Sequence, residues 1–199
     1  MPVGRLSEEV VNLFSNKGLL NKEVIKLSGR KLVFEDQKNN LILLFIRNKD
    51  VPVYVEYGAC DIGVVGKDIL LELESDVYEL YDLQLGKCKI CVAGLKEGVF
   101  KYKAGMRVAT KYPNITKKFF MKKGYSIDAI ELYGSIEVAP LLGLSDLIVD
   151  LVSTGETLRK NGLTIAEIIC LSTARLIANK NLTRIKFERI RELLNYLCY

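Results

Sequence analysis

Apolar residues recur at helical spacing near both ends of the chain. In residues 7–20, Val10, Val11 and Phe14 fall on one side of a helix for which Ser7 is the predicted N-cap. A second amphipathic helix is predicted at 182–199, where the apolar positions are Phe187, Ile190, Leu194 and Leu197. Between these two, further helices are predicted at 50–58, with Asp50 as cap, and at 67–73, 114–125, 135–143 and 155–162. Their predicted stops include the glycines Gly18, Gly58, Gly124 and Gly162.

Short apolar runs bounded by turn residues predict strands between these helices. The runs cover residues 31–36, 41–47, 60–66, 87–94, 107–112, 126–134 and 145–152. Strands and helices that alternate through short connections are typical of α/β lobes with largely parallel sheets.

Two distant segments share one plan. Residues 51–68 and 138–155 each contain a proline-bearing helix, a glycine stop, an aspartate and an apolar strand that runs into a glycine loop. The matching pairs are Gly58 with Asp61, and Gly143 with Asp146. Two lobes of similar build would place a ligand cleft at their strand ends. Chance similarity between short segments is the alternative.

The second of these loops has the composition of an anion-binding turn. Ser153, Thr154 and Gly155 follow the strand, and a helix is predicted to begin near Glu156, with Thr157 in its first turn. Backbone N–H groups at a helix start attract anions, and three hydroxyls here can donate to phosphate oxygens. Gly155 permits a positive φ and close approach to the backbone. The alternative is an ordinary N-cap.

Asp150, at the end of the same strand, is an acid beside a predicted phosphate site. A carboxylate repels phosphate but suits ribose hydroxyls or a Mg²⁺ ion that bridges a pyrophosphate. The combination therefore fits a phosphorylated ribose that carries a pyrophosphate. A capping or ion-pairing role is the structural alternative for Asp150.

Composition narrows the function classes. The 199 residues are 49% hydrophobic and 27% charged, with a net charge of +5 and no dense basic run, so we expect no nucleic-acid binding. The longest apolar run, 41–46, is far below the roughly 20 residues of a membrane span, and no apolar leader opens the chain. Five cysteines without a regular framework favour a reduced, cytoplasmic protein.

Several catalytic classes are excluded by composition. The chain contains no histidine, so Ser-His-Asp triads, Cys-His dyads and histidine metal sites cannot form. Cys88 and Cys91 form a CxxC pattern, but they lie in a predicted buried strand. Side chains three residues apart on a strand point to opposite faces, so we expect core packing there and no chelation.

Residues 146–163, "DLIVDLVSTGETLRKNGL", resemble the phosphoribosyl-pyrophosphate (PRPP) loop of the ATP phosphoribosyltransferase family, which opens histidine biosynthesis. Other segments resemble the family in the same order along nearly the whole chain. They are "GRL" at 4–6, "DVPVYVEYGACDIGVVGKDIL" at 50–70, "VYELYDL" at 77–83, "RVATKYPN" at 107–114 and "LYGSIEVAPLLGLSD" at 132–146.

The resemblance implies two similar α/β lobes around a cleft, as in type II periplasmic binding proteins. Lobe one would comprise residues 1–90 and 176–199, and lobe two residues 91–175 with the PRPP loop. The implied reaction joins N1 of ATP to C1 of PRPP with Mg²⁺ present, giving phosphoribosyl-ATP and pyrophosphate. The chain resembles the short form of the family, which implies self-association and a regulatory partner subunit similar to histidyl-tRNA synthetase.

The resemblance also implies the site residues. Ser153, Thr154, Gly155, Glu156 and Thr157 would hold the 5-phosphate of PRPP. Asp150 would be catalytic, facing the ribose or Mg²⁺ and stabilising positive charge in an oxocarbenium-like transition state, with no metal bound directly unless by Asp150. The expected ATP-binding residues are Gly4, Arg5, Arg47, Asp68 and Glu137.

Two departures from the family pattern concern ATP. Val3 stands where the family turn usually has lysine, which removes one cation. The chain also starts almost at this turn, so the leading strand of the family is largely absent.

Two rival functions remain. A base-salvage phosphoribosyltransferase would usually carry two adjacent acids before its loop, whereas Asp150 stands between Val149 and Leu151. An intracellular two-lobed ligand sensor would bind PRPP without turnover.

Overall fold

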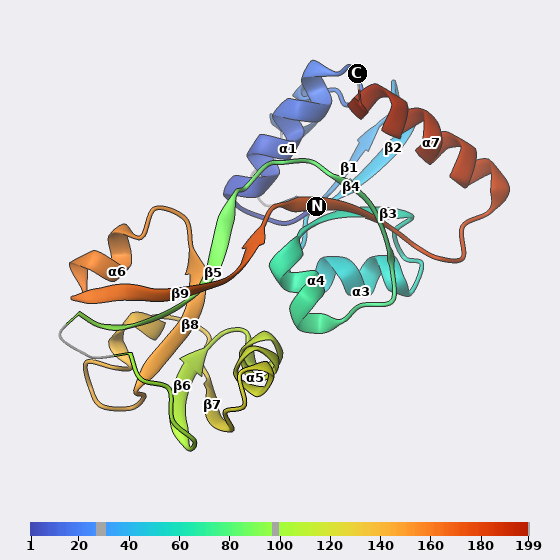
Figure 1. Cartoon of the computed structure of the whole chain (residues 1–199). Coiled ribbons are helices and arrows are strands. Elements are labelled where there is room, and N and C mark those ends of the chain that lie inside the picture. Colours follow the sequence, from blue (N-terminus) through green and yellow to red (C-terminus); the bar gives the residue numbers. More distant parts are fainter. Residues whose placement is uncertain (27–30, 97–99, 199) are drawn as a thin grey trace. The chain divides into compact units, whose positions relative to one another are not determined.

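The computed structural model describes residues 1–26, 31–96 and 100–198 and divides into two compact units (Figure 1). Unit 1 comprises Met1–Leu70, Glu74–Gly86 and Thr173–Tyr199, and unit 2 comprises Leu71–Leu73 and Lys87–Ser172. Apart from Leu71–Leu73, the chain enters unit 2 at residue 87 and returns to unit 1 at residue 173, whereas the expected crossings were near 90 and 175.

Unit 1 is an α/β unit whose main sheet is built on a strand from the C-terminal part of the chain. Strand β10 lies between β3 and β4 and is antiparallel to both. Leu176 and Ile177 of β10 are fully buried, and Arg175 joins β10 to β4 through ion pairs with Glu79 and Asp82, at 3.3 and 3.1 Å. The elements of this unit are α1 (Arg5–Asn16), α2 (Glu23–Lys26), β1 (Val33–Asp36), β2 (Leu41–Leu44), α3 (Asp50–Glu56), β3 (Ile62–Gly66), α4 (Lys67–Leu73, of which 71–73 belong to unit 2), β4 (Tyr78–Asp82), β10 (Ala174–Ala178) and α7 (Arg184–Cys198).

The first helix begins earlier than the sequence predicts. α1 starts at Arg5, and its N-cap is Gly4, whose φ of 108° lies in the region that favours glycine. Ser7 was the predicted cap, but it lies inside the first turn and donates its hydroxyl to the Gly4 carbonyl at 2.6 Å. α3 likewise begins at Asp50 with Lys49 as its N-cap, so Asp50 is the first helical residue instead of the cap.

The predicted apolar face of the last helix is correct except at its start. Ile190 and Leu197 of α7 are buried, and Leu194 packs against the core of unit 1. Phe187 is 54% exposed, contrary to the prediction. The helical spacing is right, but Phe187 lies near the start of the helix, one turn before the first residue that reaches the core.

Unit 2 contains one five-stranded mixed sheet in the order β7-β6-β8-β5-β9. Strand β6 pairs in parallel with β7 and β8, whereas β5 pairs antiparallel with β8 and β9. The expectation of largely parallel sheets is therefore wrong in both units. The elements of unit 2 are β5 (Cys88–Leu95), β6 (Met106–Thr110), α5 (Pro113–Lys122), β7 (Ile127–Glu131), the 3₁₀ turn η1 (Ile136–Val138), β8 (Leu147–Val152), α6 (Glu156–Lys160) and β9 (Leu163–Ser172).

Strand β5 contains the CxxC pattern and is the strand that the sequence predicted. Cys91 is fully buried, and Cys88 is half-buried and donates its thiol to the Ser172 carbonyl at 3.5 Å. Neither of these two cysteines forms a disulfide bond. The core interpretation of this pattern is confirmed for Cys91.

The helix predicted at 135–143 is wrong. The structure has only the 3₁₀ turn η1 followed by turns. Pro140 explains the difference, because proline has no N–H to donate to a carbonyl one turn earlier. Ser135, which precedes η1, has a φ of 46° and so also departs from helical backbone.

Candidate functional site

The predicted anion-binding loop follows β8 in unit 2. Strand β8 ends at Val152, and Ser153, Thr154 and Gly155 lead into the short helix α6. The side chains of Ser153, Thr154 and Thr157 are exposed, so their hydroxyls are available to a ligand. The hydroxyl of Thr154 accepts a 3.4 Å hydrogen bond from the backbone N–H of Glu156. The N-cap of α6 is Gly155, and no side chain forms a capping hydrogen bond there, so neither Ser153 nor Thr154 is an ordinary N-cap.

Residue 155 is glycine because of its backbone conformation, and not because a side chain would lack space there. Its φ is 74°, in the left-handed region. A Cβ at this position would meet Cγ1 of Val152 at 3.7 Å and Nη1 of Arg159 at 3.9 Å, which are ordinary contacts. The same distances show that the Arg159 guanidinium reaches back to the loop. Arg159 was not among the predicted site residues.

Asp150 lies in the last half of β8 with a side chain that is 19% exposed. Its Oδ1 accepts the N–H of Leu151 at 2.8 Å, and its Oδ2 lies 4.0 Å from Nζ of Lys111. Burial raises the pKa of the Asp150 carboxyl above its ordinary value, and the charge of Glu137 raises this pKa further. The Leu151 N–H and the Lys111 ammonium act in the opposite direction.

The position of Lys111 follows from the pairing of β6 with β8. Thr110 of β6 is level with Val149 of β8 in a parallel ladder. The next residues, Lys111 and Asp150, therefore emerge together at the carboxyl end of the strand pair. Sequence reasoning did not single out Lys111. The available signal was its place near the end of the predicted strand 107–112, because Asp150 likewise lies near the end of the predicted strand 145–152.

Glu137 is held near Asp150 by the turn η1. The preceding residue, Ile136, is fully buried and packs in one apolar cluster with Ile148 and Val152 of β8. This packing fixes η1 against the strand that carries Asp150. The charge of Glu137 is one of the causes that raise the Asp150 pKa, although a smaller one than burial.

Three of the predicted ATP-binding residues come together in unit 1. The N–H of Val3 donates to the carbonyl of Ile46 at 2.9 Å, which brings the turn at Gly4 and Arg5 beside Arg47. Pro2 and Ile46 form a single parallel bridge where the family pattern has a leading strand. The Arg5 side chain is 74% exposed and lies 3.6 Å from Glu9, and Arg47 is also exposed.

Asp68, the fourth residue of the ATP set in unit 1, is buried in the first turn of α4. Its carboxylate lies over Gly66, where a Cβ would come within 2.2 Å of Oδ1. This contact explains why residue 66 is glycine. Glu137 belongs to unit 2, so the predicted ATP set is divided between the units.

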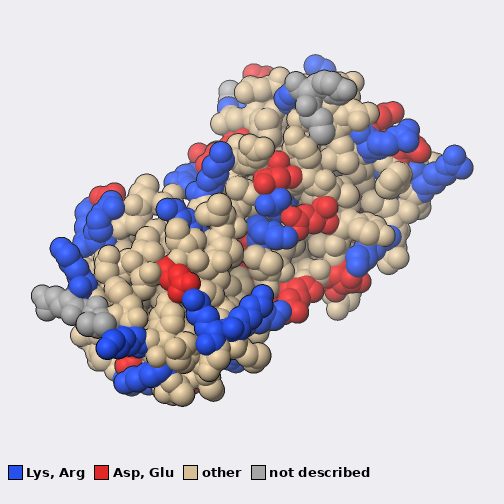
Figure 2. Space-filling model, viewed as in Figure 1, with Lys and Arg blue, Asp and Glu red and all other residues tan. Residues whose placement is uncertain are grey.

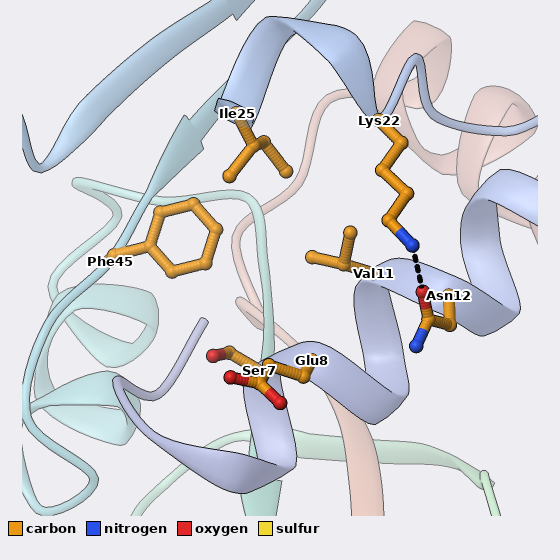
Figure 3. Close-up of a pocket in the computed structure, with 7 residues that line it drawn as sticks. All are labelled: Ser7, Glu8, Val11, Asn12, Lys22, Ile25 and Phe45. Atoms are coloured by element: carbon orange, nitrogen blue, oxygen red, sulfur yellow. Dashed lines mark hydrogen bonds between the residues drawn. The ribbon is translucent and has the colours of Figure 1, made fainter. Parts of the chain in front are cut away.

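Unit 1 also has a pocket of about 300 Å³ (Figure 3), whose lining residue Ser7 donates to the Gly4 carbonyl. Val11, Ile25 and Phe45 form its apolar wall, and Lys22 donates to Asn12 at its rim. None of its described lining residues belongs to the predicted site. Figure 2 shows basic side chains interspersed with acidic ones over one face of the molecule.

Two features are absent from the described residues. In that part of the chain, no three histidine, cysteine, aspartate or glutamate side chains are grouped closely enough to hold a metal ion. Among the same residues, no helix is long and apolar enough to cross a membrane.

Known protein sequences and solved structures show which proteins the chain is similar to. A relative from Caldanaerobacter subterraneus subsp. tengcongensis named ATP phosphoribosyltransferase is 48% identical over 98% of this chain and 92% of its own length. The solved HisG:HisZ complex of ATP phosphoribosyl transferase from Thermotoga maritima includes a chain that superposes with a TM-score of 0.83. That chain is 33% identical, and the match covers 98% of this chain and 94% of that one.

A solved structure with low sequence identity has a similar fold. A substrate-binding protein of an amino acid ABC transporter superposes with a TM-score of 0.54 at 12% identity, covering 84% of this chain and 88% of its own. This similarity confirms the two-unit α/β fold of type II periplasmic binding proteins. The family model described as HisG, ATP phosphoribosyltransferase, matches residues 47–198. The chain therefore belongs to the ATP phosphoribosyltransferase family, whose enzymes transfer the phosphoribosyl group of PRPP to ATP in the first step of histidine biosynthesis.

Proposed function

We propose that the loop after β8 is the PRPP site of this pentosyltransferase. The observation that carries the proposal is the placement of a half-buried acid, Asp150, on the same strand end as the exposed hydroxyls of Ser153, Thr154 and Thr157. Hydroxyls and backbone N–H groups suit a phosphate monoester, and a carboxylate suits the adjoining ribose. Glu156 is exposed and pairs with Lys160 at 2.8 Å, and its backbone N–H donates to the Thr154 hydroxyl at 3.4 Å, so we expect it to support the loop next to the phosphate.

Asp150 would act on the reacting ribose by electrostatics. Displacement at C1 develops positive charge on the sugar, and a fixed carboxylate lowers the energy of that state. N1 of adenine is already unprotonated at neutral pH, so little proton transfer is needed. A chain without histidine can therefore perform the reaction mainly by positioning its two substrates.

Asp150 also fits a Mg²⁺ ion brought by the substrate. It is a carboxylate near the end of β8, and Mg²⁺ commonly binds to one or two carboxylates together with substrate phosphates. When bound, the ion would share the charge of the leaving pyrophosphate. Asp150 is the side chain that we expect to face the ion or the ribose hydroxyls.

For ATP we propose the set Gly4, Arg5, Arg47, Asp68 and Glu137. The exposed guanidinium groups of Arg5 and Arg47 lie on neighbouring segments and would bind phosphate oxygens. Val3, which replaces the expected lysine, is 48% exposed beside them. Asp68, whose carboxylate lies against Gly66, would hydrogen-bond the ribose or the adenine of ATP.

We also propose that the enzyme works in the cytoplasm with a regulatory subunit and associates with itself. Support for the partner comes from the similar Thermotoga maritima chain, which was solved as part of a HisG:HisZ complex. The expected partner is a subunit similar to histidyl-tRNA synthetase.

The test is pyrophosphate release from ATP, PRPP and Mg²⁺, measured for the chain alone and with a candidate regulatory subunit. Release should require both substrates and rise with the partner. Asp150→Asn keeps the shape and removes the charge, so turnover should fall on the order of 10²-fold. Asp128→Asn is the control, because Asp128 is exposed on β7 of the same unit. Equal turnover in both variants would refute the assignment of Asp150.

A further inference from the structure

We propose that Arg159 binds the 5-phosphate of PRPP and supplies the positive charge for that phosphate. This role rests on the proposed PRPP site and adds a residue to it. A 5-phosphate carries nearly two negative charges near pH 7, whereas the hydroxyls and backbone N–H groups of the loop after β8 are uncharged donors. Three features support the role: the position of the guanidinium, the charge balance of α6 and the packing that holds this helix.

The Arg159 side chain runs back toward the loop. Its backbone N–H donates to the Gly155 carbonyl at 3.1 Å, so the two residues lie one helical turn apart. Side chains on a helix lean toward its N-terminal end. Nη1 of Arg159 accordingly lies 3.9 Å from the point that a Cβ on Gly155 would occupy. A phosphate oxygen that approaches the backbone at Gly155 from this side would therefore come within reach of the guanidinium.

The charges of α6 leave Arg159 without a partner inside the helix. Lys160, the next residue, pairs with Glu156 at 2.8 Å, so those two charges balance each other. Arg159 is exposed, and no carboxylate of the described residues forms an ion pair with it. A guanidinium can donate two parallel hydrogen bonds to a phosphate group. A bound phosphate would therefore both satisfy this side chain and be neutralised by it.

The backbone that carries Arg159 is held in place by its neighbours. Leu158 is 7% exposed and packs in one apolar cluster with Val152, the last residue of β8. At the end of α6, the backbone N–H and the side-chain amide of Asn161 donate to the Thr157 carbonyl at 3.2 and 2.9 Å. These contacts fix the helix against the strand that leads into the loop, so the guanidinium is presented to the loop from a fixed backbone.

The 5-phosphate is the end of PRPP that this position fits. Asp150, which we expect to face the ribose or Mg²⁺, precedes the loop on β8, whereas Arg159 follows the loop on α6. The leaving pyrophosphate would share its charge with Mg²⁺, but the 5-phosphate would depend on a cation from the protein. The 5-phosphate is also remote from C1, so it is bound alike before and during the reaction. Loss of Arg159 should therefore raise KM for PRPP and leave kcat nearly unchanged.

Calorimetric titration of the full chain can measure the Kd of ribose 5-phosphate and that of pyrophosphate with Mg²⁺, which represent the two ends of PRPP. Arg159→Gln should raise the Kd of ribose 5-phosphate about 10- to 100-fold, the range for hydrogen bonds to a charged group. The Kd of pyrophosphate should not change. Arg159→Lys should restore part of the binding, because lysine returns the charge without the planar pair of donors.

The matched control is Lys160→Gln. Lys160 is the adjacent exposed cation of α6, and it already pairs with Glu156. Both Kd values should stay close to those of the unchanged chain in this variant. Arg159→Ala repeats the neutral substitution in case glutamine itself donates a hydrogen bond to the phosphate. Thermal unfolding of every variant shows whether the fold is retained.

The outcomes separate the role of Arg159 from the proposed site. An unchanged Kd of ribose 5-phosphate in both neutral variants overturns this role. A rise in the Kd of pyrophosphate in place of ribose 5-phosphate also overturns it, because the guanidinium would then face the leaving group. If Gly155→Ala weakens ribose 5-phosphate binding and the Arg159 variants do not, the loop remains the phosphate site and only Arg159 is excluded. If none of these variants weakens it, the proposed phosphate site itself fails.

Discussion

At the scale of single residues, the two glycines that bound α6 share a backbone conformation and differ in their surroundings. Gly155 has a φ of 74° and Gly162 a φ of 69°. A Cβ at Gly155 would touch Val152 and Arg159, whereas a Cβ at Gly162 would meet no described atom within 4 Å. Alanine is strained at both positions by about 1 kcal/mol. Comparing alanine substitutions at these two glycines therefore distinguishes a loss of stability from a loss of activity.

Gly155→Ala should reduce both stability and turnover, and Gly162→Ala only stability. We expect similar decreases in thermal stability because the backbone strain is similar. Turnover should fall on the order of 10²-fold only for Gly155→Ala, because its methyl group stands where the phosphate would approach. Thermal unfolding and pyrophosphate release measure the two effects. Equal turnover in the two variants would contradict a phosphate site at Gly155.

The site residues that the sequence predicted differ in one respect from those that it did not indicate. Asp150 and the hydroxyls of the loop lie within a few positions of each other, so their joint chemistry is visible in the sequence. Lys111 is distant from Asp150 in sequence and becomes its neighbour only through the register of β6 on β8. Arg159 reaches Gly155 across one turn of α6, a contact that depends on a side-chain conformation.

At the scale of elements, local signals predicted most helices and several strands, and missed the other strands. The helix at 114–125 was found because Gly124, with a φ of 82°, stops it locally. Strands β9 and β10 were not predicted. β9 has few buried positions, so it lacks a clear alternation. Because these two strands pair antiparallel with β5, β3 and β4, missing them led to the wrong expectation of parallel sheets.

Two isoleucines of helix α7 can be used to test which face of the helix stabilises unit 1. Ile190 is 7% exposed, whereas Ile185 of the same helix is 82% exposed. Ile190→Ala should lower the free energy of unfolding by about 2–4 kcal/mol, because it leaves a cavity in the core. Ile185→Ala should change it by less than about 0.5 kcal/mol. Chemical denaturation followed by circular dichroism gives both values. Comparable losses would mean that the helix is oriented differently.

At the scale of the whole molecule, unit 1 is discontinuous. Its sheet is completed by β10, and its core by α7, both of which follow unit 2 in the sequence. Unit 2 has its own sheet and its own apolar cluster. The two units should therefore respond differently to a change at the C-terminal end of the chain.

Deletion of residues 184–199 tests this difference. Loss of α7 uncovers the apolar core of unit 1, so amide hydrogens in β3 and β10 should exchange much faster. Amide hydrogens in β6 and β8 should keep their protection, because their sheet lies within unit 2. Hydrogen exchange read by mass spectrometry resolves these segments. Equal loss in all four strands would show that unit 2 depends on unit 1.

The discontinuity also sets an order of events on the ribosome. Synthesis proceeds from the N-terminus, so the five strands of unit 2 are all made before β10 exists. Strands β3 and β4 must wait for that central strand, with their apolar residues uncovered while the whole of unit 2 is translated. The part of the enzyme that is made first is thus the last to fold. A chaperone that binds nascent chains would meet this protein chiefly through its N-terminal segments.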